Sequence, residues 1–142
     1  MTEYFNKFND MDMDNMKYYI SKYSNNWEDY INFNDKVPYT RNLMYSDDKI
    51  DVYLICWTKN SYSVIHNHPK DGCIMKLLEG ELEEELYNTN LELVDTRKIC
   101  KNDVTYIDDT IGLHKIIARN NVAISLHIYS PPNFVTTKFS KL

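Results

Sequence analysis

Long apolar stretches are missing from this sequence of 142 residues. Its apolar runs are short, such as 74–78, whereas a membrane-spanning helix needs about 20 consecutive apolar residues. The first residues, Met1 to Lys7, also lack the basic region, apolar stretch and small-residue cleavage site of a secretory signal. We therefore expect no membrane association and no secretion by the usual signal.

Cysteine and positive charge are also scarce. The three cysteines, Cys56, Cys73 and Cys100, are an odd number in a chain large enough to fold without crosslinks, so a disulfide framework is not expected. The 16 Lys and Arg against 21 Asp and Glu give a net charge of −5, which leaves no basic footprint for nucleic acid. The composition predicts a cytoplasmic protein in a reducing compartment, without a nucleic-acid partner.

The residues that are present suffice for a hydrophobic core. Apolar residues make up 43% of the chain and charged residues 26%, which is typical of a globular protein and not of a disordered segment. The length is that of one ordinary domain, and no linker, low-complexity tract or repeat divides it. We predict a single domain over residues 1–142.

The hydrophobic pattern changes near Pro38. Before it, residues 10–30 lack Gly and Pro and carry apolar residues at steps of three and four, which predicts one or two amphipathic helices within a helical flank over 1–36. After it, short segments with polar turns predict a β-barrel or sandwich over 37–142. The expected strands are 39–44, 50–58, 61–66, 73–79, 81–87, 90–100, 104–107, 114–118 and 122–129.

The chain has only four histidines, and three of them form a candidate metal site. Residues two apart in a strand project to the same face, so His66 and His68 would point their imidazoles together. His114, near the start of a later strand, is the best candidate for a third ligand of an Fe, Zn, Cu or Ni ion with open positions. A His-x-His pair also occurs by chance on exposed strands. Here, however, the pair lies in an apolar frame, and Gly80 turns the chain between two later strands, a combination typical of a metal-binding double-stranded β-helix.

Other polar residues have two interpretations each. Ser125, His127 and Tyr129 alternate with Leu126 and Ile128, so the polar three share one face. That face either lines a pocket or is exposed to solvent, and periodicity does not decide between the two.

Two further candidates lie near Pro38. Tyr39 and Arg41 share a face in the same way, and an arginine in a pocket offers a bidentate fork for a carboxylate. As a bare pattern, an arginine such as Arg41 is more often an ordinary surface charge.

Six segments in register resemble the thiol dioxygenases of the cysteine dioxygenase family, within the cupin superfamily. The resemblance extends from about Tyr39 to Pro132, which is most of the chain, and six segments in register are more specific than any single motif. The segments are 39–43 (YTRNL), 56–57 (CW), 65–68 (IHNH), 73–80 (CIMKLLEG), 111–114 (IGLH) and 125–132 (SLHIYSPP).

The resemblance implies a mainly β cupin fold, a double-stranded β-helix or jelly-roll-like barrel with N-terminal helices. It implies a monomeric enzyme that uses non-haem Fe(II) and O2 to oxidise the thiol of L-cysteine to cysteine sulfinate. The ligands would be His66, His68 and His114. Cys73 takes the place of the carboxylate found in most cupins, which leaves Fe(II) its full charge and favours a substrate thiolate.

The family pattern also assigns the remaining candidates. Cys73 and Tyr129 would form a thioether, a cofactor made from the protein's own side chains. Arg41 would bind the substrate carboxylate, with Tyr39 beside it, and Ser125 and His127 would position Tyr129. Without the family pattern, Cys73 reads as a buried free cysteine. At Thr136, where some members carry a cysteine near the pocket mouth, this chain has no thiol.

Three rival hypotheses remain. The first is a dioxygenase for another small thiol, such as 3-mercaptopropionate, but in relatives selective for that substrate the arginine sits elsewhere and the crosslinking cysteine is commonly a glycine. The second is a non-catalytic metal-binding cupin, against which Arg41, Cys73, His127 and Tyr129 argue together. The third is a zinc cupin, in which the Cys73 and Tyr129 pair would have no role.

Overall fold

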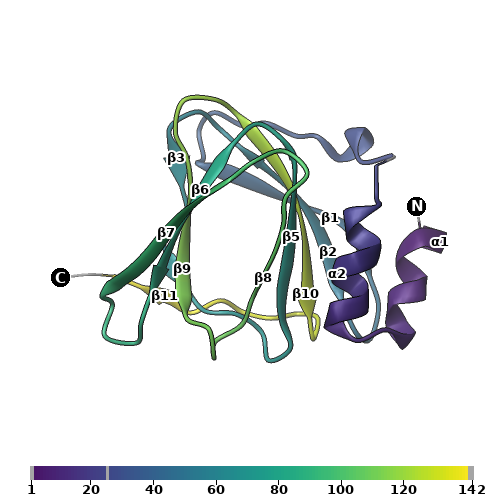
Figure 1. Cartoon of the computed structure of the whole chain (residues 1–142). Coiled ribbons are helices and arrows are strands. Elements are labelled where there is room, and N and C mark those ends of the chain that lie inside the picture. Colours follow the sequence, from purple (N-terminus) through teal and green to yellow (C-terminus); the bar gives the residue numbers. More distant parts are fainter. Residues whose placement is uncertain (1, 25, 141–142) are drawn as a thin grey trace.

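Two antiparallel β-sheets face each other in the computed structural model, which describes residues 2–24 and 26–140 (Figure 1). The first sheet has the strand order β1-β2-β10-β5-β8 and the second β11-β4-β9-β6-β7, with β3 also paired to β9. The mainly β, jelly-roll-like fold predicted from the sequence is confirmed. The strands are β1 Tyr39–Ser46, β2 Asp51–Trp57, β3 Ser61–Tyr62, β4 Ile65–His66, β5 Gly72–Glu79, β6 Leu82–Tyr87, β7 Leu93–Ile99, β8 Val104–Ile107, β9 Leu113–Ala118, β10 Ala123–Ser130 and β11 Lys138–Phe139.

Short helices cover the outer face of the first sheet (Figure 1). They are α1 Thr2–Phe5, η1 Asn6–Asp10, α2 Met13–Ser21 and η2 Glu28–Tyr30. Helix α2 begins after Asp12, whose side chain accepts a hydrogen bond from the backbone N–H of Asn15 at 2.8 Å, an N-cap that satisfies one otherwise free helix donor. The predicted amphipathic helix over 10–30 is thus present in part, and the helical turns over 2–10 precede it.

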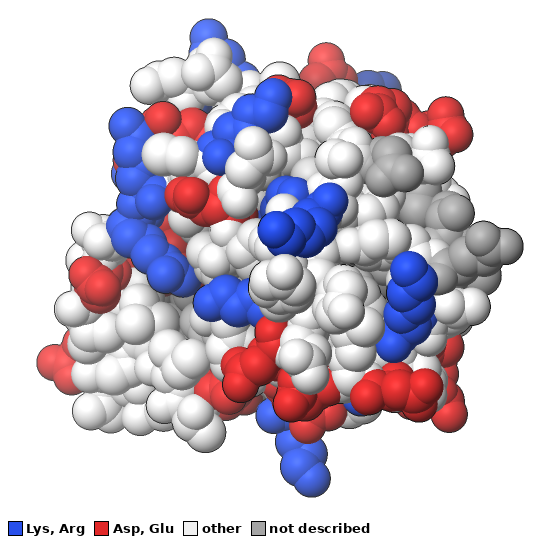
Figure 2. All heavy atoms as spheres, turned by 45° about the vertical axis from the view of Figure 1, so that its right-hand side comes forward, with Lys and Arg blue, Asp and Glu red and all other residues white. Residues whose placement is uncertain are grey.

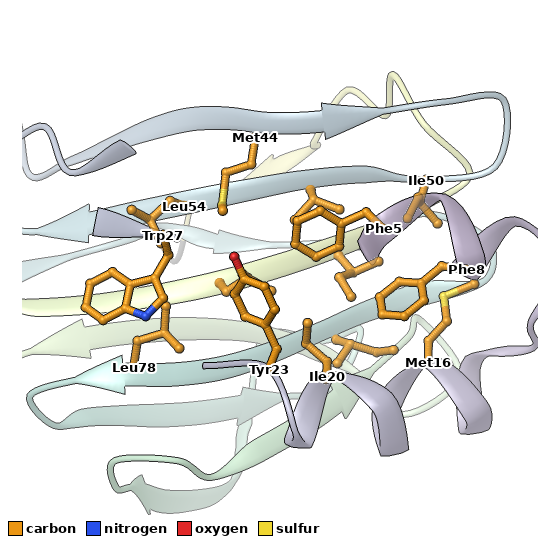
Figure 3. Close-up of a cluster of buried hydrophobic side chains, with 14 of the residues drawn as sticks. Phe5, Phe8, Met16, Ile20, Tyr23, Trp27, Met44, Ile50, Leu54 and Leu78 are labelled. Atoms are coloured by element: carbon orange, nitrogen blue, oxygen red, sulfur yellow. The ribbon is translucent and has the colours of Figure 1, made fainter. Parts of the chain in front are cut away.

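Apolar side chains join these helices to the sheet (Figure 3). Phe5, Phe8 and Met16 are at most 1% exposed, and they pack with Ile50 and Leu54 of the sheet side. This cluster buries the outward-facing residues of β2, β5 and β10. Burial of that outer face leaves the opposite, inward face of the same strands to line the space between the sheets.

Most predicted strands are present with ends shifted by up to three residues, and the strand arrangement differs from the prediction in two places. Residues 61–66 form two short strands, β3 and β4, instead of one, and Lys138–Phe139 form an additional strand that pairs with β4. The turn after β5 is made by Gly80 with a φ of 85°, a left-handed conformation that favours glycine, and the backbone carbonyl of Val122 leaves no room there for a Cβ atom.

Charges of both signs are interspersed on the face that carries the helices, with acidic groups gathered along its lower edge (Figure 2). None of the described helices combines the length and the apolar character that a membrane crossing requires.

Candidate metal centre and substrate cavity

Two of the three candidate ligands lie on strands of the second sheet, and the third follows one of these strands. His66 on β4 and His114 on β9 are direct cross-strand partners, so their side chains project to the same face. His68 lies just after β4 rather than within a strand, so the strand geometry assumed from the sequence is wrong for this residue. Its imidazole still meets the other two, with ring centroids 5.4 Å from His66 and 4.5 Å from His114.

Each imidazole is held through Nδ1 by a different acceptor. The partner of His66 is the backbone carbonyl of Val64 at 2.8 Å. His68 lies 3.1 Å from the Asp109 carboxylate, and that same oxygen accepts the backbone N–H of His68 at 2.8 Å. His114 lies 2.8 Å from the Glu84 carboxylate. An acceptor at Nδ1 keeps the proton there and leaves Nε2 as the free lone pair that a metal requires.

The second ring nitrogens converge. The Nε2 atoms of His66 and His114 are 3.0 Å apart, and one nitrogen from each of the three rings lies within 4.8 Å of the others. The Nε2 atom of His68 is fully buried and has no hydrogen-bond partner among the described residues, an arrangement that is costly unless a ligand takes the position. The three rings therefore fit a metal ion with N ligands and open positions.

Burial keeps the imidazoles of His66 and His68 neutral. Desolvation lowers the pKa of His66 to about 3 and that of His68 to about 2, and the neighbouring histidines add to both shifts. Neutral imidazole is the form that binds metals. The carboxyl of Glu84 is also buried, which raises its pKa, but the hydrogen bond from His114 and the charge of Arg97 outweigh burial, so that the net shift is downward.

A cavity of about 170 Å³ opens beside the three histidines and is lined by both sheets. From the first sheet, Arg41 reaches into it with its guanidinium carbon 4.3 Å from the ring centroid of Tyr53 and 5.5 Å from that of Tyr129. Tyr39 lines the same wall, and its ring packs 4.7 Å from that of Trp57. Arg41 and Tyr39 are therefore cavity residues and not parts of the outer surface.

The polar face of β10 is turned inward. Ser125, His127 and Tyr129 are cavity-side residues, while Leu126 and Ile128 are buried on the other face beneath the helices. Both faces of the strand are buried, which explains why periodicity alone could not choose between a pocket and a solvent-exposed face.

A hydrogen-bonded chain runs along this strand. Trp57 donates its indole N–H to the Ser125 hydroxyl at 2.9 Å, and that hydroxyl lies 2.7 Å from Nε2 of His127. The other nitrogen of His127 lies 3.4 Å from the Tyr129 hydroxyl and 3.9 Å from Sγ of Cys73. Ser125 does not line the cavity itself but holds His127 from behind.

Burial also decides the protonation of this group. It lowers the pKa of His127 well below its ordinary value, so the ring is neutral, with the charge of Arg41 acting in the same direction. Burial raises the pKa of Cys73 to about 12 against the opposing effects of Arg41 and Tyr129. Burial likewise raises the pKa of Tyr129. The cysteine and the tyrosine therefore both keep their protons at neutral pH.

The C-terminal strand adds residues to the cavity. Lys138 on β11 is the cross-strand partner of His66, and Lys138 and Thr136 both line the cavity. Lys138 was not predicted as a site residue, because a two-residue strand leaves no periodic signal in the sequence.

Two acidic residues behind the ligands were also missed. For Glu84 a signal existed: it lies two residues from Leu82 and two from Leu86 in a strand and therefore shares their face. Asp109 lies in a turn before β9 and carries no comparable signal.

Comparison with known proteins decides the family. The family model described as "Cysteine dioxygenase type I" matches residues 4–142. The chain belongs to the cysteine dioxygenase type I family. The resemblance seen in the sequence segments is confirmed.

Curated cysteine dioxygenases share about a third of the aligned residues. The chain is 37% identical over 115 residues to cysteine dioxygenase type 1 of Homo sapiens and 36% identical over 115 residues to that of Rattus norvegicus, in each case 75% of this chain and 57% of the relative. It is 32% identical over 125 residues to the protein of Danio rerio, which is 80% of this chain and 62% of that relative. The chain thus spans about three-fifths of the length of the cysteine dioxygenases it matches.

Solved structures agree on the fold. A double-stranded β-helix protein from Klebsiella pneumoniae superposes with a TM-score of 0.67 at 16% identity, covering 80% of this chain and 88% of that one. A cupin superfamily protein from Desulfitobacterium hafniense gives 0.58 at 12% identity over 70% and 83% of the two chains. The chain therefore has the cupin fold expected from its sequence.

Proposed function

We propose that this protein oxidises the thiol of L-cysteine to cysteine sulfinate with O2, using Fe(II) held by His66, His68 and His114. Both atoms of O2 add to the sulfur, so R–SH becomes R–SO2H; sulfur is oxidised, O2 is reduced, and no further reductant is needed. The observation that carries the proposal is the convergence of three imidazoles on one end of a cavity whose facing wall carries Arg41.

When bound, Fe(II) supplies a +2 charge that favours the substrate as a thiolate and a centre that reacts with O2. Arg41 binds the substrate carboxylate through its guanidinium fork. The rings of Tyr53 and Tyr129 contact the guanidinium and hold it in position. Tyr39 closes the wall beside it. Binding at two fixed points, the metal and Arg41, sets the position of the sulfur.

The Cys73 and Tyr129 pair would be joined by a thioether. Loss of the thiol hydrogen and of one ring hydrogen beside the tyrosine hydroxyl forms the C–S bond, and O2 accepts the two electrons and two protons. Ser125 and His127 act as positioning residues for Tyr129: the Ser125 hydroxyl contacts Nε2 of His127 and holds the ring so that its Nδ1 faces the tyrosine oxygen.

The proposal takes residues 1–142 as one working domain, with the flank 1–36 and the barrel 37–142. Support comes from the packing of Phe5, Met16 and Ile20 against the sheet that carries Arg41, His127 and Tyr129. Removal of the helices would expose the outer face of that sheet.

A thiol acid without an amine, such as 3-mercaptopropionate, is a second candidate substrate. Lys138 favours it, because a cation beside His66 attracts a carboxylate and repels the ammonium group of cysteine. Arg41 in its position on β1 and the presence of Cys73 favour cysteine.

Product analysis separates the candidates. Iron-loaded protein is incubated in air with L-cysteine, 3-mercaptopropionate or cysteamine, and sulfinate formation is measured beside oxygen uptake. We expect one cysteine sulfinate to form for each O2 consumed, and we expect cysteine to be strongly preferred over the other two thiols. Preference for 3-mercaptopropionate would overturn the substrate, and no turnover at full iron occupancy would favour a binding-only cupin. One equivalent of zinc and no iron in protein from iron-supplemented cells would remove the dioxygenase hypothesis.

A further inference from the structure

The three ligand imidazoles differ in the charge that stands behind them. His66 has only a neutral backbone carbonyl at Nδ1, and the carboxylate behind His68 belongs to Asp109, whose side chain is 49% exposed. The carboxylate behind His114 belongs to Glu84, whose side chain is 5% exposed. His114 is therefore the ligand whose Nδ1 contacts a buried negative charge.

Glu84 is held from the other side by a surface cation. Its second carboxylate oxygen accepts a hydrogen bond from Nε of Arg97 at 2.6 Å, and the Arg97 side chain is 48% exposed. Arg97 on β7 is the cross-strand partner of Glu84 on β6, and β6 in turn pairs with β9, which carries His114. Arg97, Glu84 and His114 thus form a line across three neighbouring strands, from solvent to the metal centre.

This line has a direct electrostatic consequence. A carboxylate that accepts the Nδ1 proton fixes the tautomer and the ring orientation and makes the opposite nitrogen a stronger electron donor. A cation on the far side of that carboxylate draws charge away from the imidazole and weakens the effect. The buried carboxylate and the surface cation therefore act on the ligand in opposite directions.

We propose that Glu84 is a positioning residue for His114 and that Arg97, acting through Glu84, sets the affinity and the reduction potential of the bound metal. The inference rests on the proposed metal site but not on the oxidation of cysteine. It makes the strength of one ligand adjustable from the protein surface.

The chain offers a matched control in an ion pair between the neighbouring residue of β6 and the residue that follows β9. Glu83 pairs with Arg119 on the outer side of the sheet, both side chains are more than a third exposed, and neither contacts a ligand histidine. Glu84→Gln and Arg97→Met are therefore compared with Glu83→Gln and Arg119→Met. Apo protein is titrated anaerobically with Fe(II), and the Fe(III)/Fe(II) midpoint potential is measured with redox mediators.

The two test variants should move the metal centre in opposite directions. Glu84→Gln keeps a neutral acceptor but removes the charge, so Fe(II) affinity should fall about 10- to 100-fold and the potential should rise. Arg97→Met frees the carboxylate from its cation, so the potential should fall. The two control variants should match the unmodified protein in both measurements.

Equal affinities and potentials for Glu84→Gln and Glu83→Gln would overturn the proposal, as would a shift of the same sign in Arg97→Met and Glu84→Gln. If Glu84→Gln does not fold, Arg97→Met, which alters an exposed side chain, decides by the sign of its shift. Absence of any divalent-metal binding also overturns the proposal. If Fe(II) affinity and midpoint potential shift in the variants as expected but no thiol is oxidised, this proposal is upheld and the proposed reaction is rejected.

Discussion

Cys73 and Tyr129 are direct cross-strand partners in the ladder between β5 and β10. Their side chains project to the same inward face, and His127 lies within 3.9 Å of the Cys73 sulfur on that face. Partners of this kind have Cβ atoms about 5 Å apart. A bond between the two side chains therefore needs no rearrangement of the sheet.

The first prediction concerns this bond. Aerobic incubation of iron-loaded protein with cysteine should produce a form that is two hydrogens lighter, with the peptides that contain Cys73 and Tyr129 linked. Peptide mass spectrometry measures the fraction. Cys73→Ser and Tyr129→Phe should each lack the linked peptide, and its appearance in either variant would rule out this pair as the crosslink.

Thiol reactivity should separate the three cysteines. Cys100 is exposed, whereas Cys56 and Cys73 are buried. Because the pKa of Cys73 is raised to about 12, its reactive thiolate is scarce at pH 8 and increases only as the pH approaches that value. Iodoacetamide should modify Cys100 first in the folded protein. Fast modification of Cys73 at pH 8 would contradict the buried, protonated thiol.

Arg41→Ala should weaken the use of substrates that carry a carboxylate. Loss of a hydrogen bond to a charged group costs about 1.5–3 kcal/mol, which corresponds to a decrease of roughly 10- to 150-fold in kcat/KM for cysteine. Fe(II) affinity should stay the same. Cysteamine, which has no carboxylate, serves as the control substrate, and an equal loss with cysteamine would argue against a carboxylate contact.

Lys138→Met tests the second cation of the cavity. An exposed charge contributes up to about 1 kcal/mol, so the ratio of kcat/KM for 3-mercaptopropionate to that for cysteine should fall up to about fivefold. Lys98→Met is the matched control, because Lys98 is an exposed cation that pairs with Glu81 away from the cavity. An unchanged ratio in Lys138→Met would remove this residue from substrate selection.

The turn after β5 should be sensitive to substitution. Gly80→Ala places a side chain at a positive φ and against the backbone carbonyl of Val122, so the free energy of unfolding should fall by about 2–4 kcal/mol. Urea unfolding measures this loss. Glu81→Ala, at the neighbouring exposed position, should change the stability by less than about 1 kcal/mol.

Much of the barrel follows from local patterns in the sequence. Segments such as 104–107 and 73–79 alternate or are fully apolar and lie between turn residues, so their strands could be placed to within a residue or two. The helical turns over 2–10 could not be placed in this way, because they are held by packing and not by a helical repeat: Phe5 packs against Tyr23 and Tyr45, and Phe8 packs against Phe5.

The cavity residues needed more than periodicity. His66, His68 and His114 could be grouped because histidine is rare in the chain, and the structure brings them together. The roles of Arg41, Tyr39, Cys73, Ser125, His127 and Tyr129 came from the family pattern and stay predictions, as do the monomeric state and the cytoplasmic location. Glu84 had a local signal in its spacing from Leu82 and Leu86, whereas the place of Lys138 depends on which strands become neighbours, which no local pattern shows.

The two sheets contribute different halves of the site. The ligand histidines belong to the second sheet or directly follow one of its strands, while Arg41, Cys73, His127 and Tyr129 belong to the first. Substitutions in β1 or β10 can therefore reshape one wall while the opposite wall keeps its metal ligands. A directed-evolution library confined to β1 and β10 should yield variants with altered substrate choice and intact metal loading. After gene duplication, mutations that accumulate in these two strands could change the substrate in the same way without loss of the metal ligands.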